Sequence, residues 1–287
     1  MTRKRFFFIL AFLALTAFLK PRPLFAESIS DSAIPFKTID YFFNEKADYD
    51  ISFLWFDKAA EGSFQFMRED DGFKAVLQAE TKGFIGFLTS YRKHVYISHL
   101  VYVPEKGKLR ARVFERNVVI GDKTERTITY LDYGRRLMEW EDYKGGKLKE
   151  KKSQEIPAGM EYEDILSAFL NFRLGVYGPI ERERKFSINT IPEKGQAIID
   201  VNILSREAAL KLKSMFGKDY REDLMPIKVK VPKEIFKSKT GEVAILMDDR
   251  ILPIIGVVEN YIGFGDIRAV LRTGKIVPAA GSKESVD

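Results

Sequence analysis

The amino-acid sequence predicts a mainly β protein, in which a curved antiparallel sheet forms an incomplete barrel and one or two helices lie against it. In many short runs apolar and polar residues alternate with a period of two, which is typical of strands with one buried and one solvated face. Turn sequences such as Pro104–Gly107 and Pro192–Gly195 separate these runs at short intervals. Many short strands with regular turns favour a barrel, a half-barrel or a sandwich.

The N-terminal segment has the three parts of a secretory signal peptide. Residues 3–5 are basic, an apolar run covers Phe6–Leu19, and Ala26 is a small residue suited to cleavage. The run has 14 residues, whereas a transmembrane helix needs about 20. We therefore predict a cleaved signal peptide over 1–26, a periplasmic mature protein, and no transmembrane span in the mature form.

The net charge of +6 is concentrated in this segment, which holds five of the 47 basic residues and no acidic residue. The remaining chain carries 42 basic and 41 acidic residues, so its nearly neutral balance offers no general attraction for nucleic acid. The sequence contains no Cys, which excludes disulfides and a lipid-anchored lipoprotein. The fold must therefore rely on its core alone.

The strand patterns predict one β domain over 47–273, preceded by a leading arm over 27–46 and followed by a disordered tail over 274–287. In Tyr49–Trp55, the first strand, every second residue is a large apolar one. Further alternating runs lie at 109–113, 127–130, 197–203, 227–231 and 267–269. The Asp248-Asp249 pair stands between two apolar runs and predicts a hairpin turn.

Two segments have the composition of helices. In Tyr162–Phe172 apolar residues recur at helical spacing, and Gly175 follows as a terminator. This helix is too apolar to be free in water, so we expect it to lie against the concave face of the sheet. A second helix over Ser205–Phe216 has Ser205 as its expected N-cap. The family resemblance described below favours a strand there, so the sequence leaves open whether 206–216 is helix or strand.

The residues that catalysis or metal binding would need are scarce. The two histidines, His94 and His99, are five positions apart and would face opposite sides of a strand, which is incompatible with a shared metal ion. Gly263-Phe264-Gly265 lacks the third glycine of a dinucleotide-binding loop. We therefore predict no catalytic residue, no metal site and no cofactor.

Large apolar residues crowd the first third of the mature chain, in places on both faces of a strand. They form either a thick β core or an apolar groove for an acyl chain or another lipid-like ligand. The residues that we predict for such a ligand cavity are Trp55, Phe84, Phe87, Tyr96, Ile165, Phe169 and Phe172.

Three segments resemble DUF3108 proteins, a family of exported bacterial envelope proteins of unknown function. Met160–Arg173 resembles the helix segment of the family, although Ile165 stands where the family usually has proline. Ala244–Ile254 resembles its strand, Asp-Asp turn and Leu-Pro segment, and Gly263–Leu271 resembles its glycine turn and final strand. The resemblance covers roughly residues 45–272. It implies an exported envelope protein with an antiparallel sheet curled into an incomplete barrel, and it implies no catalytic residues.

Export and the apolar excess favour a non-enzymatic binding or carrier module of the periplasm, with an apolar or lipid-like ligand. The alternative hypothesis is a structural or protein-interaction component of the envelope, which would recruit a protein partner through a strand edge or an apolar patch. A hydrolase of an envelope polymer is the third hypothesis. It would need the histidines, or acidic residues such as Asp248 and Asp249, to converge in a cleft.

Overall fold

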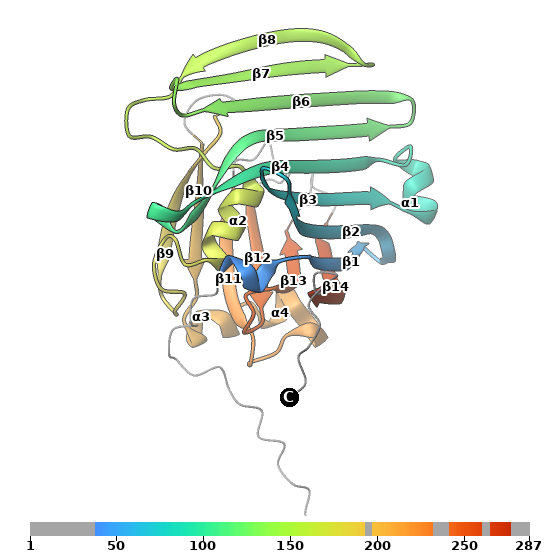
Figure 1. The fold of residues 1–287 in the computed structure, drawn as a ribbon. Coiled ribbons are helices and arrows are strands. Elements are labelled where there is room, and N and C mark those ends of the chain that lie inside the picture. Colours follow the sequence, from blue (N-terminus) through green and yellow to red (C-terminus); the bar gives the residue numbers. More distant parts are fainter. Residues whose placement is uncertain (1–37, 193–196, 232–240, 260–264, 277–287) are drawn as a thin grey trace, which may run out of the picture.

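The computed structural model describes residues 38–192, 197–231, 241–259 and 265–276 of the chain (Figure 1). The predicted signal peptide at 1–26 lies outside the described residues, as do 27–37 of the predicted arm and 277–287 of the predicted tail. Within the described part of the arm, a short 3-10 helix, η1 (Ile39–Phe42), precedes the first strand, which begins at Glu45.

The strands in the described residues all belong to one antiparallel sheet of 14 strands, in the order β8-β7-β6-β5-β4-β3-β2-β1-β14-β13-β12-β11-β10-β9. Their bounds are β1 Glu45–Phe53, β2 Phe56–Glu69, β3 Gly72–Thr81, β4 Lys93–Val103, β5 Lys108–Ile120, β6 Lys123–Asp132, β7 Leu137–Lys144, β8 Lys147–Glu155, β9 Lys185–Thr190, β10 Ala197–Ile203, β11 Met225–Lys230, β12 Glu242–Met247, β13 Pro253–Val258 and β14 Ile267–Ile276. The outermost strands, β8 and β9, do not pair with each other in the described part of the chain, so the sheet stays open. The predicted fold class is confirmed.

The sheet bends into two limbs, one formed by β1–β8 and the other by β9–β14, which meet where β1 pairs with β14 (Figure 1). In the limb of β1–β8, residues that pair directly across strands point to the same face. Ala47 pairs with Phe64, and Phe64 pairs with Leu77, so all three lie on the concave face. Phe64 and Ala47 are buried there. The period-two alternation of the sequence therefore marks which residues face the interior.

One alternating run is interrupted by a bulge. His99 pairs with Val113 and Leu100 pairs with Ala111, which leaves Arg112 of β5 without an opposite residue. Val113 therefore does not continue the inward face of Leu109 and Ala111, although 109–113 is an alternating pattern in the sequence. Bulges of this kind redirect side chains locally and increase the twist of the sheet.

The predicted apolar helix is α2 (Ile165–Arg173), which lies against β3, β4 and β5 on the concave side of the sheet (Figure 1). It begins three residues later than the apolar pattern. Asp164 is the N-cap, and its side chain accepts hydrogen bonds from the backbone N–H groups of Leu166 and Ser167 at 2.7 and 3.0 Å. The apolar residues of α2 join the core of one limb to the core of the other.

The segment at 206–216, which the sequence left open, is helical. It forms two short helices, α3 (Arg206–Leu210) and α4 (Lys213–Phe216), followed by the 3-10 helix η3 (Gly217–Asp219). Ser205 caps α3 by accepting a hydrogen bond from the backbone N–H of Ala208 at 3.1 Å. Phe216 is fully buried in a third apolar cluster under β12 and β13.

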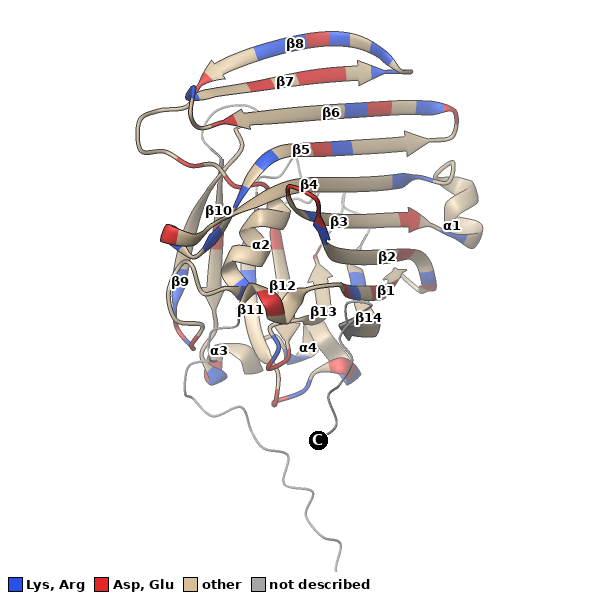
Figure 2. Cartoon of the chain, viewed as in Figure 1, with Lys and Arg blue, Asp and Glu red and all other residues tan. Residues whose placement is uncertain are grey.

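The hairpin predicted at Asp248-Asp249 is confirmed, because β12 and β13 pair on either side of it. Asp248 fixes this turn by accepting hydrogen bonds from the backbone N–H groups of Arg250 and Leu252, at 3.0 and 2.9 Å. At the edge of the sheet, β8 is exposed along its whole length and rich in charged residues (Figure 2). Charge on an edge strand discourages edge-to-edge association.

Two further short elements complete the described chain: the helix α1 (Gly83–Leu88), between β3 and β4, and the 3-10 helix η2 (Pro104–Lys106), between β4 and β5. None of the helices described here has the length and apolarity that a membrane-crossing helix requires.

Candidate functional site

The structure divides the seven predicted ligand residues among three places. Trp55, Phe84 and Phe87 come together at one end of the sheet, on the β1–β2 turn and on α1 (Figure 1). Tyr96 lies on β4, on the concave face. The remaining three, Ile165, Phe169 and Phe172, are residues of α2.

The first group belongs to a larger exposed surface that we call the aromatic rim, formed by Leu54, Trp55, Phe56, Phe84, Phe87, Leu88 and Tyr91. The Phe56 ring joins its two parts, with its centroid 5.5 Å from that of Trp55 and 5.9 Å from that of Phe84. Trp55 is 78% exposed and Phe87 is 69% exposed. These large apolar side chains are exposed to solvent, where they add nothing to the stability of the core. Contiguous exposed apolar side chains are typical of an interaction surface.

Backbone hydrogen bonds hold the rim in place. The N–H of Lys82 donates to the carbonyl of Ala59 at 2.8 Å, which ties the start of α1 to β2. After α1, the carbonyl of Ser90 accepts from the N–H of Gly121 at 2.7 Å, which ties the loop to the β5–β6 turn. The rim side chains are therefore presented on a fixed frame.

A glycine on α1 permits one close contact within the rim. A Cβ atom at Gly86 would lie 2.8 Å from the ring of Tyr91, closer than side chains can approach. The N–H of Tyr91 also donates to the carbonyl of Gly86 at 2.6 Å. Tyr91 therefore folds back over α1, and glycine at position 86 leaves room for its ring because glycine has no Cβ atom.

Tyr96 occupies a different environment on the concave face. Its ring stacks on Phe114 of the neighbouring strand, with centroids 6.2 Å apart, and on His94 at 6.5 Å. The side chain is half-buried and packs against the core cluster that surrounds α2. It is thus part of the inner wall of the sheet and not of the rim.

The three α2 residues pack within the core. The Phe169 ring meets Phe64 edge to face with centroids 5.4 Å apart, and the Phe172 ring meets Phe186 at 5.9 Å. Ile165 packs against the clusters of both limbs. The apolar spacing that suggested a ligand surface here is explained by helix packing against the sheet.

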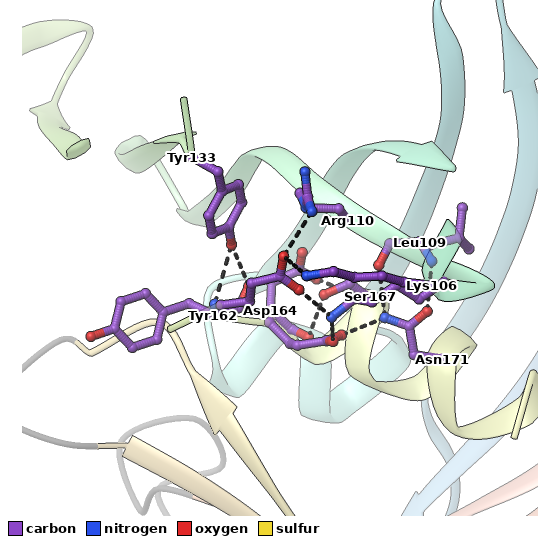
Figure 3. Close-up of polar contacts among 11 residues, drawn as sticks. Lys106, Leu109, Arg110, Tyr133, Tyr162, Asp164, Ser167 and Asn171 are labelled. Atoms are coloured by element: carbon purple, nitrogen blue, oxygen red, sulfur yellow. Dashed lines mark hydrogen bonds and ion pairs between the residues drawn. The ribbon is translucent and has the colours of Figure 1, made fainter. Parts of the chain in front are cut away.

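Polar side chains fix α2 to the sheet from within (Figure 3). The hydroxyl of Ser98 on β4 donates to Asp164 at 2.6 Å, and Asp164 is buried. Desolvation raises the pKa of Asp164, against the hydrogen bonds from Ser98 and from the helix N–H groups. Asn171 bonds to both backbone groups of Leu109, at 2.8 Å each, in the manner of a neighbouring strand.

Charged side chains of β5 and of the segment before α2 extend this network, and two of them, Lys108 and Glu163, are buried. Lys108 donates to Glu161 and to Glu163 at 2.9 Å each, and Arg110 donates to Glu161 at 2.7 Å (Figure 3). Burial by itself would raise the pKa of Glu161. Hydrogen bonds from Lys106 and Lys108, and the nearby positive charges, outweigh burial and lower the pKa of Glu161 to about 2.

This pKa shift predicts an acid-sensitive contribution to stability. In the unfolded chain Glu161 has its ordinary pKa of about 4.5, so its stabilisation should be fully present above that pH and should disappear as the pH falls toward 2. We expect Glu161→Gln to lower the free energy of unfolding at neutral pH by about 1–2 kcal/mol, because solvent screening reduces the full linkage value. Urea unfolding of both proteins between neutral pH and pH 2 would measure this; a constant difference across that range would contradict it.

A groove of about 390 Å³ lies on the opposite, convex face of the β1–β8 limb, beside the Arg112 bulge. In it, His99 bonds through Nδ1 to Glu69 at 2.8 Å, and its Nε2 lies 3.9 Å from Glu115. Arg126 bonds to Glu115 at 2.7 Å. His94 points to the concave face instead, as the odd spacing of the two histidines predicts. The two histidines therefore do not share a site, and Asp248 is occupied in its turn.

The sequence predicted Trp55, Phe84 and Phe87 as ligand residues but assigned them to a cavity, and the predicted set did not include the other four rim residues, Leu54, Phe56, Leu88 and Tyr91. A signal for the exposure of these residues is present in the sequence. The run Gly83–Leu88 has no polar side chain and yet no period of two. Such a run does not fit a strand with one solvent-exposed face, because that strand would alternate apolar and polar residues. It is also too short to form a helix of the core by itself.

The sequence matches no protein-family model, and no curated protein is significantly similar to it. Among solved structures, the chain is similar to the crystal structure of a β-barrel-like protein of the domain of unknown function DUF1849 from Brucella abortus. The TM-score is 0.45 and the identity 10%, over 83% of this chain and 99% of that chain. A similarity of this size carries no information about function.

Proposed function

We propose that this protein is a non-enzymatic binding module of the cell envelope, which engages an apolar, lipid-like ligand with its aromatic rim. The observation that carries the proposal is the clustering of exposed apolar side chains at one end of the sheet. Of the 11 large apolar residues that are exposed in the described chain, six belong to the rim: Leu54, Trp55, Phe84, Phe87, Leu88 and Tyr91. The other five are dispersed over β4, β6, β8, β10 and α3.

The exposed apolar side chains of the rim can supply free energy for binding an apolar ligand. Complete burial of one large apolar side chain contributes about 1.5–3 kcal/mol. Apart from the half-buried Phe56, the rim residues are between 44% and 78% exposed, so each of these six retains a substantial part of that free energy for binding. The adjoining ring contacts of Phe56 keep the rim continuous between the β1–β2 turn and α1.

Placement in the periplasm is part of the proposal. It is supported by the N-terminal charged and apolar segment and by the resemblance of 160–173, 244–254 and 263–271 to DUF3108 proteins. In the structure the first of these segments contains α2, and the second contains the β12–β13 hairpin.

The two tryptophans of the chain allow a direct test. Trp55 is on the rim, whereas Trp140 on β7 is half-buried against the core around α2. We expect the single-tryptophan variant Trp140→Phe to show a saturable blue shift in emission when a short-chain lysophosphatidylcholine is added below its micelle concentration. In Trp55→Phe, where Trp140 is the reporter, the emission should change little.

The rim should also be required for affinity. We expect the double variant Phe84→Ser/Phe87→Ser to bind the same lysolipid at least about tenfold more weakly, because two apolar contacts are lost. Its stability should change by less than about 1 kcal/mol, since both side chains are mainly exposed. The matched control is Leu148→Ser/Leu210→Ser, which removes apolar residues that are 51% and 52% exposed elsewhere. Equal affinity in the two double variants would refute the proposal in favour of a protein-interaction or hydrolase role.

A further inference from the structure

We infer that the aromatic rim is a membrane-docking surface, which inserts its apolar side chains into the interface of a bilayer that contains anionic lipid. The inference rests on the proposed function, because it names the bilayer as the source of the lipid-like ligand. Three independent features of the rim support it: its side-chain types, the charges that surround it, and the backbone conformation that holds it outward.

The side-chain types are those of a membrane interface. The rim contains tryptophan, tyrosine, phenylalanine and leucine, and Trp and Tyr are favoured at the level of lipid headgroups. Trp55, Phe87 and Leu88 are exposed by 78%, 69% and 60%, respectively. A surface that binds by partial insertion needs side chains that protrude from a fixed base, and the backbone bonds of Lys82 and Ser90 supply that base.

Basic residues flank the rim. The segments 54–58 and 82–93 contain four basic side chains, Lys58, Lys82, Arg92 and Lys93, and one acidic side chain, Asp57. Lys58 is 70% exposed at its side chain and lies 4.0 Å from Asp50, and Lys82 lies 3.4 Å from Glu80. These acidic partners lie on β1 and β3, farther from the rim along the sheet than the basic side chains. Figure 2 shows α1 drawn mainly in tan, with both basic and acidic segments at the neighbouring strand ends. Cations beside an apolar tip complement the negative charge of anionic headgroups.

The backbone holds bulky residues of the rim in a conformation that such residues rarely adopt. Leu54 has φ of 56° and Tyr91 has φ of 47°, both in the left-handed region. This region costs roughly 1–2 kcal/mol for a residue other than glycine. Strain of this kind accumulates where function requires a particular side-chain placement. At both positions it accompanies an exposed apolar side chain, 44% for Leu54 and 56% for Tyr91.

Partition into vesicles tests the inference. The purified protein is sedimented with vesicles of phosphatidylcholine alone and with vesicles of equal parts phosphatidylcholine and phosphatidylglycerol. We expect binding to the anionic vesicles that weakens at high salt. Phe84→Ser/Phe87→Ser should reduce partition into the anionic vesicles at least about tenfold. The double variant Lys58→Ser/Lys93→Ser should reduce it by about fivefold for each basic side chain lost.

Matched controls distinguish docking through the rim from nonspecific adsorption to the vesicles. Leu148→Ser/Leu210→Ser and Lys147→Ser/Lys149→Ser remove the same kinds of side chain from exposed positions outside the rim. Both should sediment like the unchanged protein. Trp55 should be quenched by a spin label near the lipid headgroup more than by one at the end of the acyl chain, and Trp140 should be quenched by neither. Rim and control variants with equal partition, or quenching of Trp140 alone, would overturn the inference.

The same proteins distinguish failure of the inference from failure of the proposed function. If the protein binds monomeric lysolipid through the rim but does not partition into either kind of vesicle, the ligand is taken from solution and docking is wrong. If it partitions through the rim but binds no monomeric lysolipid, docking is right and the proposed capture of a single lipid is wrong. If neither occurs, both are wrong.

Discussion

Replacing Arg173 with methionine is expected to lower the free energy of unfolding by about 3–5 kcal/mol, the cost of leaving one charge of a buried pair without its partner. Arg173 of α2 is fully buried, and Glu45 of β1 is 4% exposed. The guanidinium bonds to both carboxylate oxygens of Glu45, one of them at 3.0 Å, and also to the carbonyl of Arg250 at 3.3 Å. It lies over the Phe42 ring at 4.1 Å. The pair therefore links the helix, the first strand and the β12–β13 turn.

Unfolding in guanidinium chloride, followed by circular dichroism, would measure this loss. The m-value, which is the slope of the free energy of unfolding against denaturant concentration, should be the same for the variant and the unchanged protein. The control Lys151→Met removes a cation that is 53% exposed and 3.1 Å from Glu141, so we expect a loss below about 1 kcal/mol. The double variant Glu45→Leu/Arg173→Met should recover part of the loss, because no buried charge is then left unpaired. If Arg173→Met and Lys151→Met were equally mild, the pair would not hold the limbs together.

The second large effect is expected at Asn171, where leucine should cost about 3 kcal/mol or more. The amide of Asn171 is buried and bonds to the backbone N–H and carbonyl of Leu109, and its Nδ2 also bonds to Glu163 at 2.7 Å. Leucine has a similar volume but would leave these buried groups without partners, each at a cost of about 1–3 kcal/mol. The side chain thus completes the hydrogen bonding at the start of β5.

Hydrogen exchange adds a local measurement to this prediction. The amide of Leu109 should lose protection in Asn171→Leu beyond the general loss of stability. The matched control is Ser167→Ala on the same helix, which removes a buried hydroxyl whose bond to the Asp164 carbonyl is 3.1 Å long. We expect that change to cost no more than about 1.5 kcal/mol. Protection of Leu109 that fell equally in both variants would contradict the role assigned to Asn171.

The candidate site was predictable in its residue types but not in its arrangement. Trp55, Phe84 and Phe87 stand out in the sequence as large apolar residues, and Phe169 and Phe172 stand out equally. The structure exposes the first three and packs the other two. Composition records that a side chain is apolar, whereas exposure depends on whether another element covers it. No element of the described chain covers α1 and the β1–β2 turn, and the sheet covers α2.

Local patterns by themselves determined the antiparallel strands, the apolar helix, the Asp248 turn and the opposite faces of His94 and His99, because each depends on periodicity or turn chemistry within a few residues. Only the tertiary structure decided the pairing of β1 with β14, the Arg112 bulge, the Arg173–Glu45 pair and the exposure of the aromatic rim. Arg173 and Glu45 are 128 positions apart in the chain. A period shows which residues share a face, but what lies opposite that face is set by strand register and by contacts between segments far apart in the sequence.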